Sequence, residues 1–219
     1  MKLSKKFLND YLDVVDLDIK KIADDMTNIG NEYADCSKFI NVTNLVIGKV
    51  IECNLHPDSD HLHVCKVDIK DEILNIVCGA PNVREGLKVI VAKNGAILPG
   101  GEIKKTIIRG VESNGMICSI AELGLDHKYL KEEDINGIHE LPFDAPIGED
   151  PIKYLNFDDE IIDFELTSNR GDLLSIIGMA YEVGAIYNRK VKLPERKYEV
   201  VKEDIPFNLK IDTKKCKYS

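Results

Sequence analysis

The chain has 219 residues, 44% of them hydrophobic, which suits one large or two ordinary domains with a buried core and excludes a disordered chain. Its net charge of -9 and pI of about 5.1 argue against a protein that binds nucleic acid through overall positive charge, because such affinity comes from neutralised phosphates. No run of about 18 apolar residues is present, and charged residues follow Met1 too soon for a signal peptide. We therefore expect a cytoplasmic protein without a membrane partner.

The first 40 residues predict two helices. Ser4 is a suitable N-cap for the first, Asp16 or Asp18 for the second, and Gly30 is a suitable stop. Apolar residues recur at intervals of three and four in both segments: Phe7, Leu8, Tyr11, Leu12 and Val15, then Ile19, Ile22, Ala23, Met26 and Ile29. Neither helix can bury its apolar stripe alone, so a partner must come from elsewhere in the chain.

From Asn44 to Cys118 the pattern changes to that of strands. Short runs rich in Val and Ile cover 45–53, 62–69, 72–78, 87–92 and 115–118, and turn signals separate them. Five short strands over this length favour a small barrel of the oligonucleotide-binding (OB) type, with a β-sandwich as the alternative. Ser119 and Glu122 have the spacing of a capping box, so we expect a helix to begin after Cys118.

A linker marked by Pro142, Pro146 and Pro151 follows, then a strand-like alternation over 158–166. The run from Thr167 to Asp172 leads into an apolar helix over 173–187, where Asp172 suits the first turn. We expect this helix to pack on the two N-terminal ones. The sequence therefore predicts an α+β fold in which a five-stranded OB-fold barrel is inserted in a small helical or mixed domain formed by both flanks. The expected boundaries are 1–40 with 151–194 for the helix-rich domain, 41–150 for the barrel and 195–219 for a linker and the truncated start of a further domain.

No catalytic or metal site is expected in this chain. The six cysteines form no Cys-x-x-Cys pair, which favours buried free thiols. His56, His61, His63 and Cys65 cluster in sequence, but alternate residues of one strand do not make a tetrahedral site without a ligand from another element. No histidine lies close in sequence to Ser113, so nucleophilic catalysis has little support.

One basic stretch between residues 84 and 114 carries the candidates for RNA contact. They are Arg84, Lys88, Lys93, Lys104, Lys105, Arg109, Ser113 and Asn114. No Phe, Tyr or Trp occurs between Phe39 and Tyr129, so we expect shape and phosphate contacts rather than base stacking, unless His61 or His63 serves as the stacking side chain. The alternative for the basic residues is a solvated surface. The alternative for Ser113 and Asn114 is that they serve only to form a turn.

Several motifs carry a resemblance to a known family. Arg109-Gly110-Val111, followed by Ser113, Gly115 and Met116, resembles the signature of the tRNA-binding OB barrels that accompany aminoacyl-tRNA synthetases. The stretches 56–68, 76–86 and 165–180 resemble the family of bacterial phenylalanyl-tRNA synthetase β subunits.

The resemblance implies a part of the ATP-dependent ligase that joins phenylalanine to tRNA(Phe), an α2β2 assembly with the α subunit as partner. ATP and Mg would serve the full enzyme, with no cofactor expected in this part, which would have no catalytic activity of its own. The stretch 207–219 resembles the start of the family's editing region. A stand-alone structure-specific tRNA-binding protein and an architectural module with little RNA contact are the alternatives. The full length of the gene would separate the synthetase from the stand-alone protein.

Overall fold

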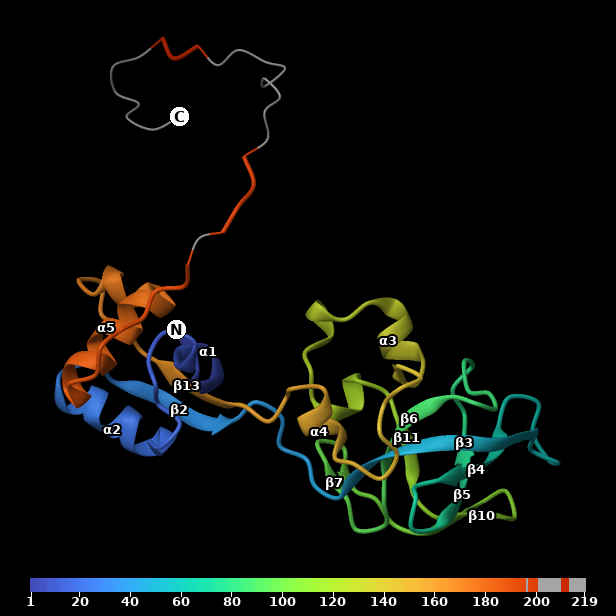
Figure 1. Cartoon of the computed structure of the whole chain (residues 1–219). Helices are drawn as coiled ribbons and strands as arrows, with labels where there is room; N and C mark the ends of the chain where they lie inside the picture. The colour runs from blue at the N-terminus through green and yellow to red at the C-terminus, as the bar shows by residue number, and fades with distance from the viewer. Residues whose placement is uncertain (196, 201–209, 213–219) are drawn as a thin grey trace.

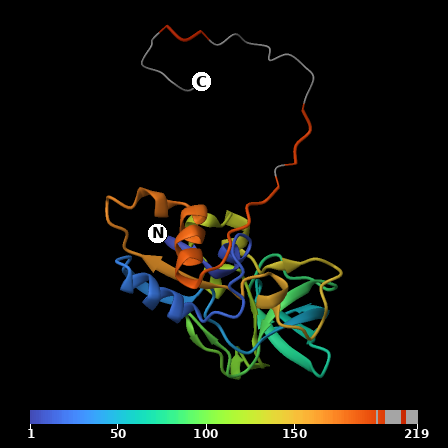
Figure 2. The same cartoon turned by 60° about the vertical axis from the view of Figure 1, so that its left-hand side comes forward.

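Residues 1–38 and 160–187 fold together, and residues 45–154 between them form a second body. The computed structural model describes residues 1–195, 197–200 and 210–212. In Figure 1 the blue N-terminal and orange C-terminal segments lie side by side, and the rotated view in Figure 2 has them together again. Most of the stretch 207–219, which resembles the start of an editing region, lies outside the described residues, as does the thiol of Cys216.

The flanking segments contain a three-stranded antiparallel sheet in the order β1-β13-β2. Its strands are β1 (Lys2–Ser4), β13 (Glu160–Phe164) and β2 (Tyr33–Lys38), and the helices are α1 (Lys5–Asn9), α2 (Ile19–Asn28), the 3-10 turn η3 (Gly171–Leu174) and α5 (Ile176–Tyr187). The strand expected over 158–166 is therefore present as β13. Strands β1 and β2 were not predicted.

Local capping explains where the first two helices begin. The side chain of Ser4 accepts the Phe7 amide and that of Asp18 accepts the Lys21 amide, both at 2.9 Å. The first helix is shorter than predicted because Asn9 Oδ1 accepts the Val14 amide at 2.9 Å and the chain turns there. Val14 consequently enters the core, and Val15 is exposed.

The helix expected over 173–187 is present over Ile176–Tyr187 as α5, and it packs on the N-terminal helices as predicted. Leu8 of α1 and Met26 of α2 share one buried cluster with Met179 and Val183 of α5. Burial of apolar surface in this cluster is the main stabilising contribution for the body formed by the flanks. No helix in the described part of the chain is long and apolar enough to cross a membrane.

The middle of the chain forms a six-stranded antiparallel sheet. The strand order is β11-β6-β3-β4-β5, and β12 also pairs with β6. The strands are β3 (Leu45–Leu55), β4 (His63–Asp68), β5 (Ile73–Cys78), β6 (Lys88–Ala92), β11 (Met116–Cys118) and β12 (Glu140–Leu141). Two hairpins, β7 (Ile97–Leu98) with β8 (Gly101–Glu102) and β9 (Thr106–Ile108) with β10 (Val111–Ser113), lie between β6 and β11. The five runs predicted as strands all occur within two residues of their expected bounds.

The sheet bends because β3 is long and irregular. Its first half pairs with β6, from Leu45 opposite Ala92 to Lys49 opposite Lys88, and its second half pairs only with β4 beyond an irregularity between Val50 and Glu52. The two ends of the strand order approach each other, since the Asn114 amide donates to Asn75 O of β5 at 2.7 Å. No ladder of strand pairs joins β5 to β11 among the described residues, so a closed five-stranded barrel is not confirmed.

The connection after β11 differs from the expected helix. The capping box is present, with the Ser119 amide donating to Glu122 Oε2 at 2.6 Å and the Glu122 amide donating to Ser119 Oγ at 3.2 Å. It caps only the 3-10 turn η1 (Ala121–Leu123), which Gly124 ends with a φ of 99°. Three short helical segments follow: η2 (His127–Tyr129), α3 (Glu132–Asn136) and α4 (Pro151–Tyr154).

Candidate nucleic-acid interface

The β9–β10 hairpin presents Arg109 at its tip. Arg109 and Gly110 have φ values of 46° and 83°, the positive values of a two-residue type I′ turn. Glycine adopts such a φ freely, whereas an arginine needs other contacts to hold it there. One such contact is the bond from the Arg109 guanidinium to Asp58 O at 2.9 Å.

A buried histidine fixes the same hairpin tip to the turn after β3. His56 Nδ1 accepts the Asp58 amide at 3.1 Å, and its Nε2 lies 3.2 Å from Ile108 O. Because Nδ1 accepts, the ring proton is assigned to Nε2, which donates to the carbonyl. His56 therefore anchors the hairpin. This anchoring role of His56 was not predicted from the sequence.

Ser113 and Asn114 hold the base of the hairpin against β5. Ser113 is 2% exposed, and its hydroxyl accepts the Val77 amide at 3.0 Å and donates to Gly115 O at 3.2 Å. The Asn114 backbone bonds to Asn75, whose side-chain amide donates to Glu112 O at 2.7 Å. The hydroxyl of Ser113 is thus used inside the fold and is not offered to a ligand.

The lysines of this region are partly neutralised by nearby carboxylates. Lys104 Nζ lies 3.1 Å from Glu102 and Lys105 Nζ lies 2.7 Å from Glu112, and all four side chains are exposed. Such exposed ion pairs are weak, about 0–1 kcal/mol, so a phosphate can replace a carboxylate at little cost. Lys93 is half-buried and has no ion pair with any described residue.

Arg84 and Lys88 lie at a different place, on the edge formed by β6 and β12. The Arg84 guanidinium makes two bonds of 2.8 Å to the Glu140 carboxylate, which raise the pKa of Arg84 and lower the pKa of Glu140 from their ordinary values. Lys88 Nζ donates to Ala145 O at 2.5 Å and lies 5.5 Å from the centre of the Phe143 ring. The basic stretch is therefore divided between this edge and the β9–β10 hairpin.

Phe143 is an exposed aromatic side chain that the sequence did not identify as part of this interface. Its ring is 85% exposed beside Lys88, because the pairing of Leu141 with Lys88 returns the chain to β6. Phe143 lies beyond Tyr129, outside the stretch 40–128 that contains no aromatic residue. The pairing of β12 with β6 could not be predicted from a two-residue strand, so no sequence signal placed Phe143 at this edge.

The cysteines and histidines of the sheet do not form a metal site in the described part of the chain. Cys53 and Cys65 are opposite each other on β3 and β4 with their sulfur atoms 3.8 Å apart, and both are free thiols. Burial raises the pKa of Cys65, and it raises the pKa of Cys118 to about 12. These thiols are protonated at neutral pH and unsuited to nucleophilic chemistry.

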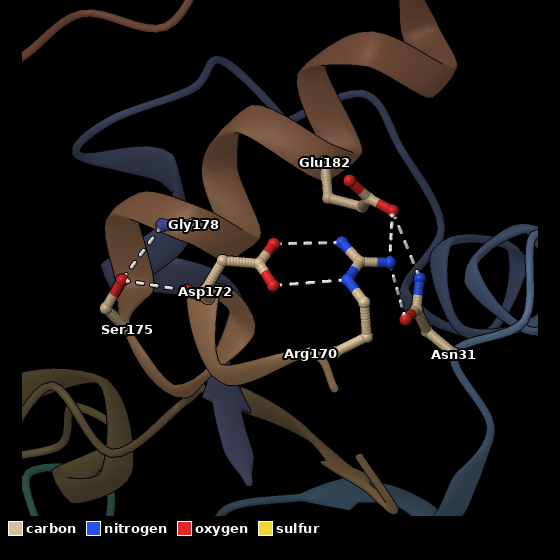
Figure 3. Close-up of polar contacts among 6 residues, drawn as sticks. All are labelled: Asn31, Arg170, Asp172, Ser175, Gly178 and Glu182. Atoms are coloured by element: carbon tan, nitrogen blue, oxygen red, sulfur yellow. Dashed lines mark hydrogen bonds and ion pairs between the residues drawn. The ribbon is translucent and has the colours of Figure 1, made fainter. Parts of the chain in front are cut away.

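The motif around Arg170 belongs to the other body and has a structural role (Figure 3). The Arg170 guanidinium donates to Asp172 at 3.0 and 3.2 Å, to Glu182 of α5 at 3.0 Å and to Asn31 at 3.1 Å. These bonds raise the pKa of Arg170 and lower the pKa of Asp172. The network joins the turn after α2 to α5.

The position of Asp172 differs from the sequence prediction. Helix α5 begins at Ile176, and its N-cap is Ser175, whose hydroxyl accepts the Gly178 amide at 3.1 Å (Figure 3). Asp172 lies in the preceding turn η3 and pairs with Arg170 instead of facing the first turn of the helix.

Comparison with known proteins shows what the six-stranded sheet and most of the chain are similar to. Residues 45–150 match the family described as "Putative tRNA binding domain". These are the residues from the start of β3 to the N-cap of α4, so the match covers the six-stranded sheet and its hairpins.

The chain is 48% identical over 198 residues to the phenylalanine–tRNA ligase beta subunit of Geobacillus kaustophilus, an alignment covering 89% of this chain and 25% of that protein. It is 44% identical over 206 residues to the same subunit of Bacillus subtilis, covering 93% of this chain and 26% of that protein. The resemblance stated from the motifs is therefore confirmed. The chain spans about a quarter of the length of these relatives and corresponds to their N-terminal part.

Among solved structures, the crystal structure of a MetRS related protein from Pyrococcus horikoshii is similar at 23% identity and a TM-score of 0.34, covering 48% of this chain and 84% of that chain. A TM-score this low supports no conclusion about the fold.

Proposed function

We propose that this chain is the tRNA-associated N-terminal part of a phenylalanine–tRNA ligase β subunit. The observation that supports this most is that the tRNA-binding match coincides with the six-stranded sheet, within a chain 48% identical to such a subunit. In this proposal residues 41–150 are the tRNA-binding domain, with an OB-type barrel closed between β5 and the segment Ser113–Gly115. Residues 1–40 and 151–194 form its supporting domain, and 195–219 lead into the next one.

The complete enzyme in this proposal is a cytoplasmic ligase that attaches phenylalanine to tRNA(Phe). It uses ATP and Mg, and the β subunit assembles with the synthetase α subunit as α2β2. The catalytic steps belong to parts of the assembly outside this chain. The role of this chain is to hold tRNA, and no cofactor is assigned to it.

We assign the phosphate contacts to the basic side chains of the two groups described above, of which Lys88 and Lys93 are half-buried and the others exposed. Lys93, Lys104, Lys105 and Arg109 serve at and around the β9–β10 hairpin, and Arg84 and Lys88 serve at the β6–β12 edge. The side chain of Asn114 is a further donor beside the hairpin. Arg109 is the best-positioned contact, because its backbone conformation and its bond to Asp58 fix the direction of the guanidinium.

A salt titration of tRNA binding tests this proposal. Each neutralised phosphate adds roughly 0.7–0.9 to the slope of log affinity against log salt. We expect weak binding with a shallow slope, because only a few basic side chains are available. Replacing Lys88, Lys104, Lys105 and Arg109 together by alanine should abolish most of the binding. The matched control replaces Lys20 and Lys21, exposed lysines of α2 that are also paired with aspartates, and should leave binding unchanged.

Two results would contradict the assignment. A steep salt dependence would mean many phosphate contacts, and unchanged affinity in the fourfold variant would mean that the contacts lie elsewhere. The neutralisation of Arg84, Lys104 and Lys105 by carboxylates favours a second candidate, an architectural module that touches RNA little. Complete absence of tRNA binding at low salt would favour that module.

A further inference from the structure

An exposed aromatic ring stands on the β6–β12 edge. Phenylalanine is among the residues most often buried, yet Phe143 is 85% exposed. Its position is fixed from both sides, because Leu141 pairs with Lys88 and the Ala145 amide donates to Pro142 O at 3.0 Å. The backbone that carries the ring therefore has a defined place on the surface, and the described residues cover little of the ring.

The ammonium group of Lys88 is held close to this ring. Lys88 Nζ lies 5.5 Å from the ring centre, within the range of a cation–π interaction, and its bond to Ala145 O holds it there. An aromatic ring has two faces. A cation beside one of them leaves the other free for a planar group.

A second lysine shares the same face of the sheet. Lys49 of β3 is directly opposite Lys88 of β6, and like charges in such cross-strand pairs repel. Asp68 is opposite Lys49 on the other side, but no ion pair within 4.0 Å forms between them, and Asp68 Oδ1 accepts the Lys70 amide at 2.8 Å. The exposed carboxylate of Asp144 follows the ring, and that of Glu140 is engaged by Arg84. An anion between Lys49 and Lys88 would relieve their repulsion.

We propose that Phe143, Lys88 and Lys49 form a binding site for one unpaired nucleotide of RNA. The base stacks on the free face of the Phe143 ring, and the adjoining phosphate interacts with the two ammonium groups. Stacking on aromatic side chains beside a basic surface is the general way in which proteins hold single-stranded nucleic acid. This inference rests on the proposed tRNA association, and it adds a contact with an unpaired base, which the sequence had led us not to expect.

The absence of tryptophan from the chain gives a direct test. In the Phe143→Trp variant the introduced indole is the only tryptophan, and a stacked base should quench its fluorescence. The probe is a single-stranded oligoadenylate of about ten nucleotides, within the site size of one OB-type domain. The matched control is Tyr129→Trp, since Tyr129 is also 76% exposed with a lysine, Lys128, 4.7 Å from its ring. We expect saturable quenching at position 143 and none at position 129.

The Phe143→Leu variant measures the strength of stacking in the full chain. We expect its affinity for the oligoadenylate to fall about 5- to 150-fold, the equivalent of about 1–3 kcal/mol for one stacked base. Both variants should fold normally, because the side chain that they replace is exposed. Equal quenching at both positions, or an unchanged affinity in Phe143→Leu, would overturn the site.

Parallel titrations with folded tRNA and with AMP separate the possible failures. If tRNA binds the unaltered chain but the oligoadenylate quenches nothing, the nucleotide site is wrong and the proposed function stands. Failure of tRNA to bind at all, with quenching by the oligoadenylate intact, would instead remove the proposed function. Quenching by AMP at the same concentrations would show a site for free nucleotides and overturn its assignment to RNA.

Discussion

Replacing Ser113 by alanine should destabilise the six-stranded sheet and leave RNA affinity unchanged. The hydroxyl is 2% exposed and bonds on both sides, accepting the Val77 amide at 3.0 Å and donating to Gly115 O at 3.2 Å. Alanine removes both bonds without creating a large cavity. The Val77 amide then has no acceptor in a place where water does not reach it.

The size of the effect follows from that unsatisfied amide. Leaving a buried donor without a partner costs about 1–3 kcal/mol. For a chain of this size each kcal/mol lowers the melting temperature by about 2–4 °C. A loss in this range would confirm that Ser113 stabilises the contact between β5 and the hairpin.

Calorimetry of the Ser113→Ala variant measures the loss of stability of the whole fold. Hydrogen exchange at the Val77 amide measures the loss of the hydrogen bond itself. The control is Thr106→Ala, because Thr106 is opposite Ser113 on β9 and its hydroxyl is exposed. Thr106→Ala should change the free energy of unfolding by less than about 0.5 kcal/mol. Unchanged Val77 exchange together with reduced tRNA affinity would refute this reasoning and make Ser113 an RNA contact.

Three further predictions concern other parts of the fold. Gly115→Ala should lower the free energy of unfolding, measured by chemical denaturation, by at least about 1–3 kcal/mol, because φ is 118° and a Cβ would lie 2.7 Å from Ala92 O. The control is Gly100→Ala, since a Cβ at Gly100 would meet open space. Arg170→Lys should lower the melting temperature nearly as much as Arg170→Ala, because an ammonium cannot reproduce the forked bonds to Asp172 and Glu182; full rescue by lysine would contradict this. Burial lowers the pKa of His139, so the unfolded chain binds a proton at a higher pH than the folded chain does. The free energy of unfolding should therefore fall as the pH drops below about 6.5, and His139→Gln should make this fall with pH smaller.

Features encoded by near neighbours in the chain could be predicted from the sequence. The caps at Ser4 and Asp18 and the Ser119/Glu122 box depend on residues three apart, and all three are present. The strands of the central sheet follow from period-two runs between turn signals. The short strands β1 and β2 could not be predicted, because three- and six-residue segments become strands only by pairing with β13, which begins more than a hundred residues further on.

The sequence indicated the residue types of the candidate interface, but it did not predict which side chains are paired, buried or exposed. Charge along the chain identified Arg84, Lys104 and Lys105, yet the Glu140 partner of Arg84 is distant in sequence. Burial of Ser113 depends on its contact with β5. Exposure of Phe143 depends on the pairing of β12 with β6. These environments are set by tertiary contacts, which residue spacing does not reveal.

The charge balance of the chain determines what kind of recognition this surface can provide. With a net charge of -9, and carboxylates already beside several of the basic residues, long-range attraction of RNA is small. Affinity must then come from donors that are in place before RNA arrives, since ordering flexible lysines would cost further entropy. The bonds of His56 and Asp58 to the hairpin and of Ala145 to Lys88 supply that order. Such a surface should discriminate RNA shapes more by the fixed positions of a few groups than by the number of phosphates it neutralises.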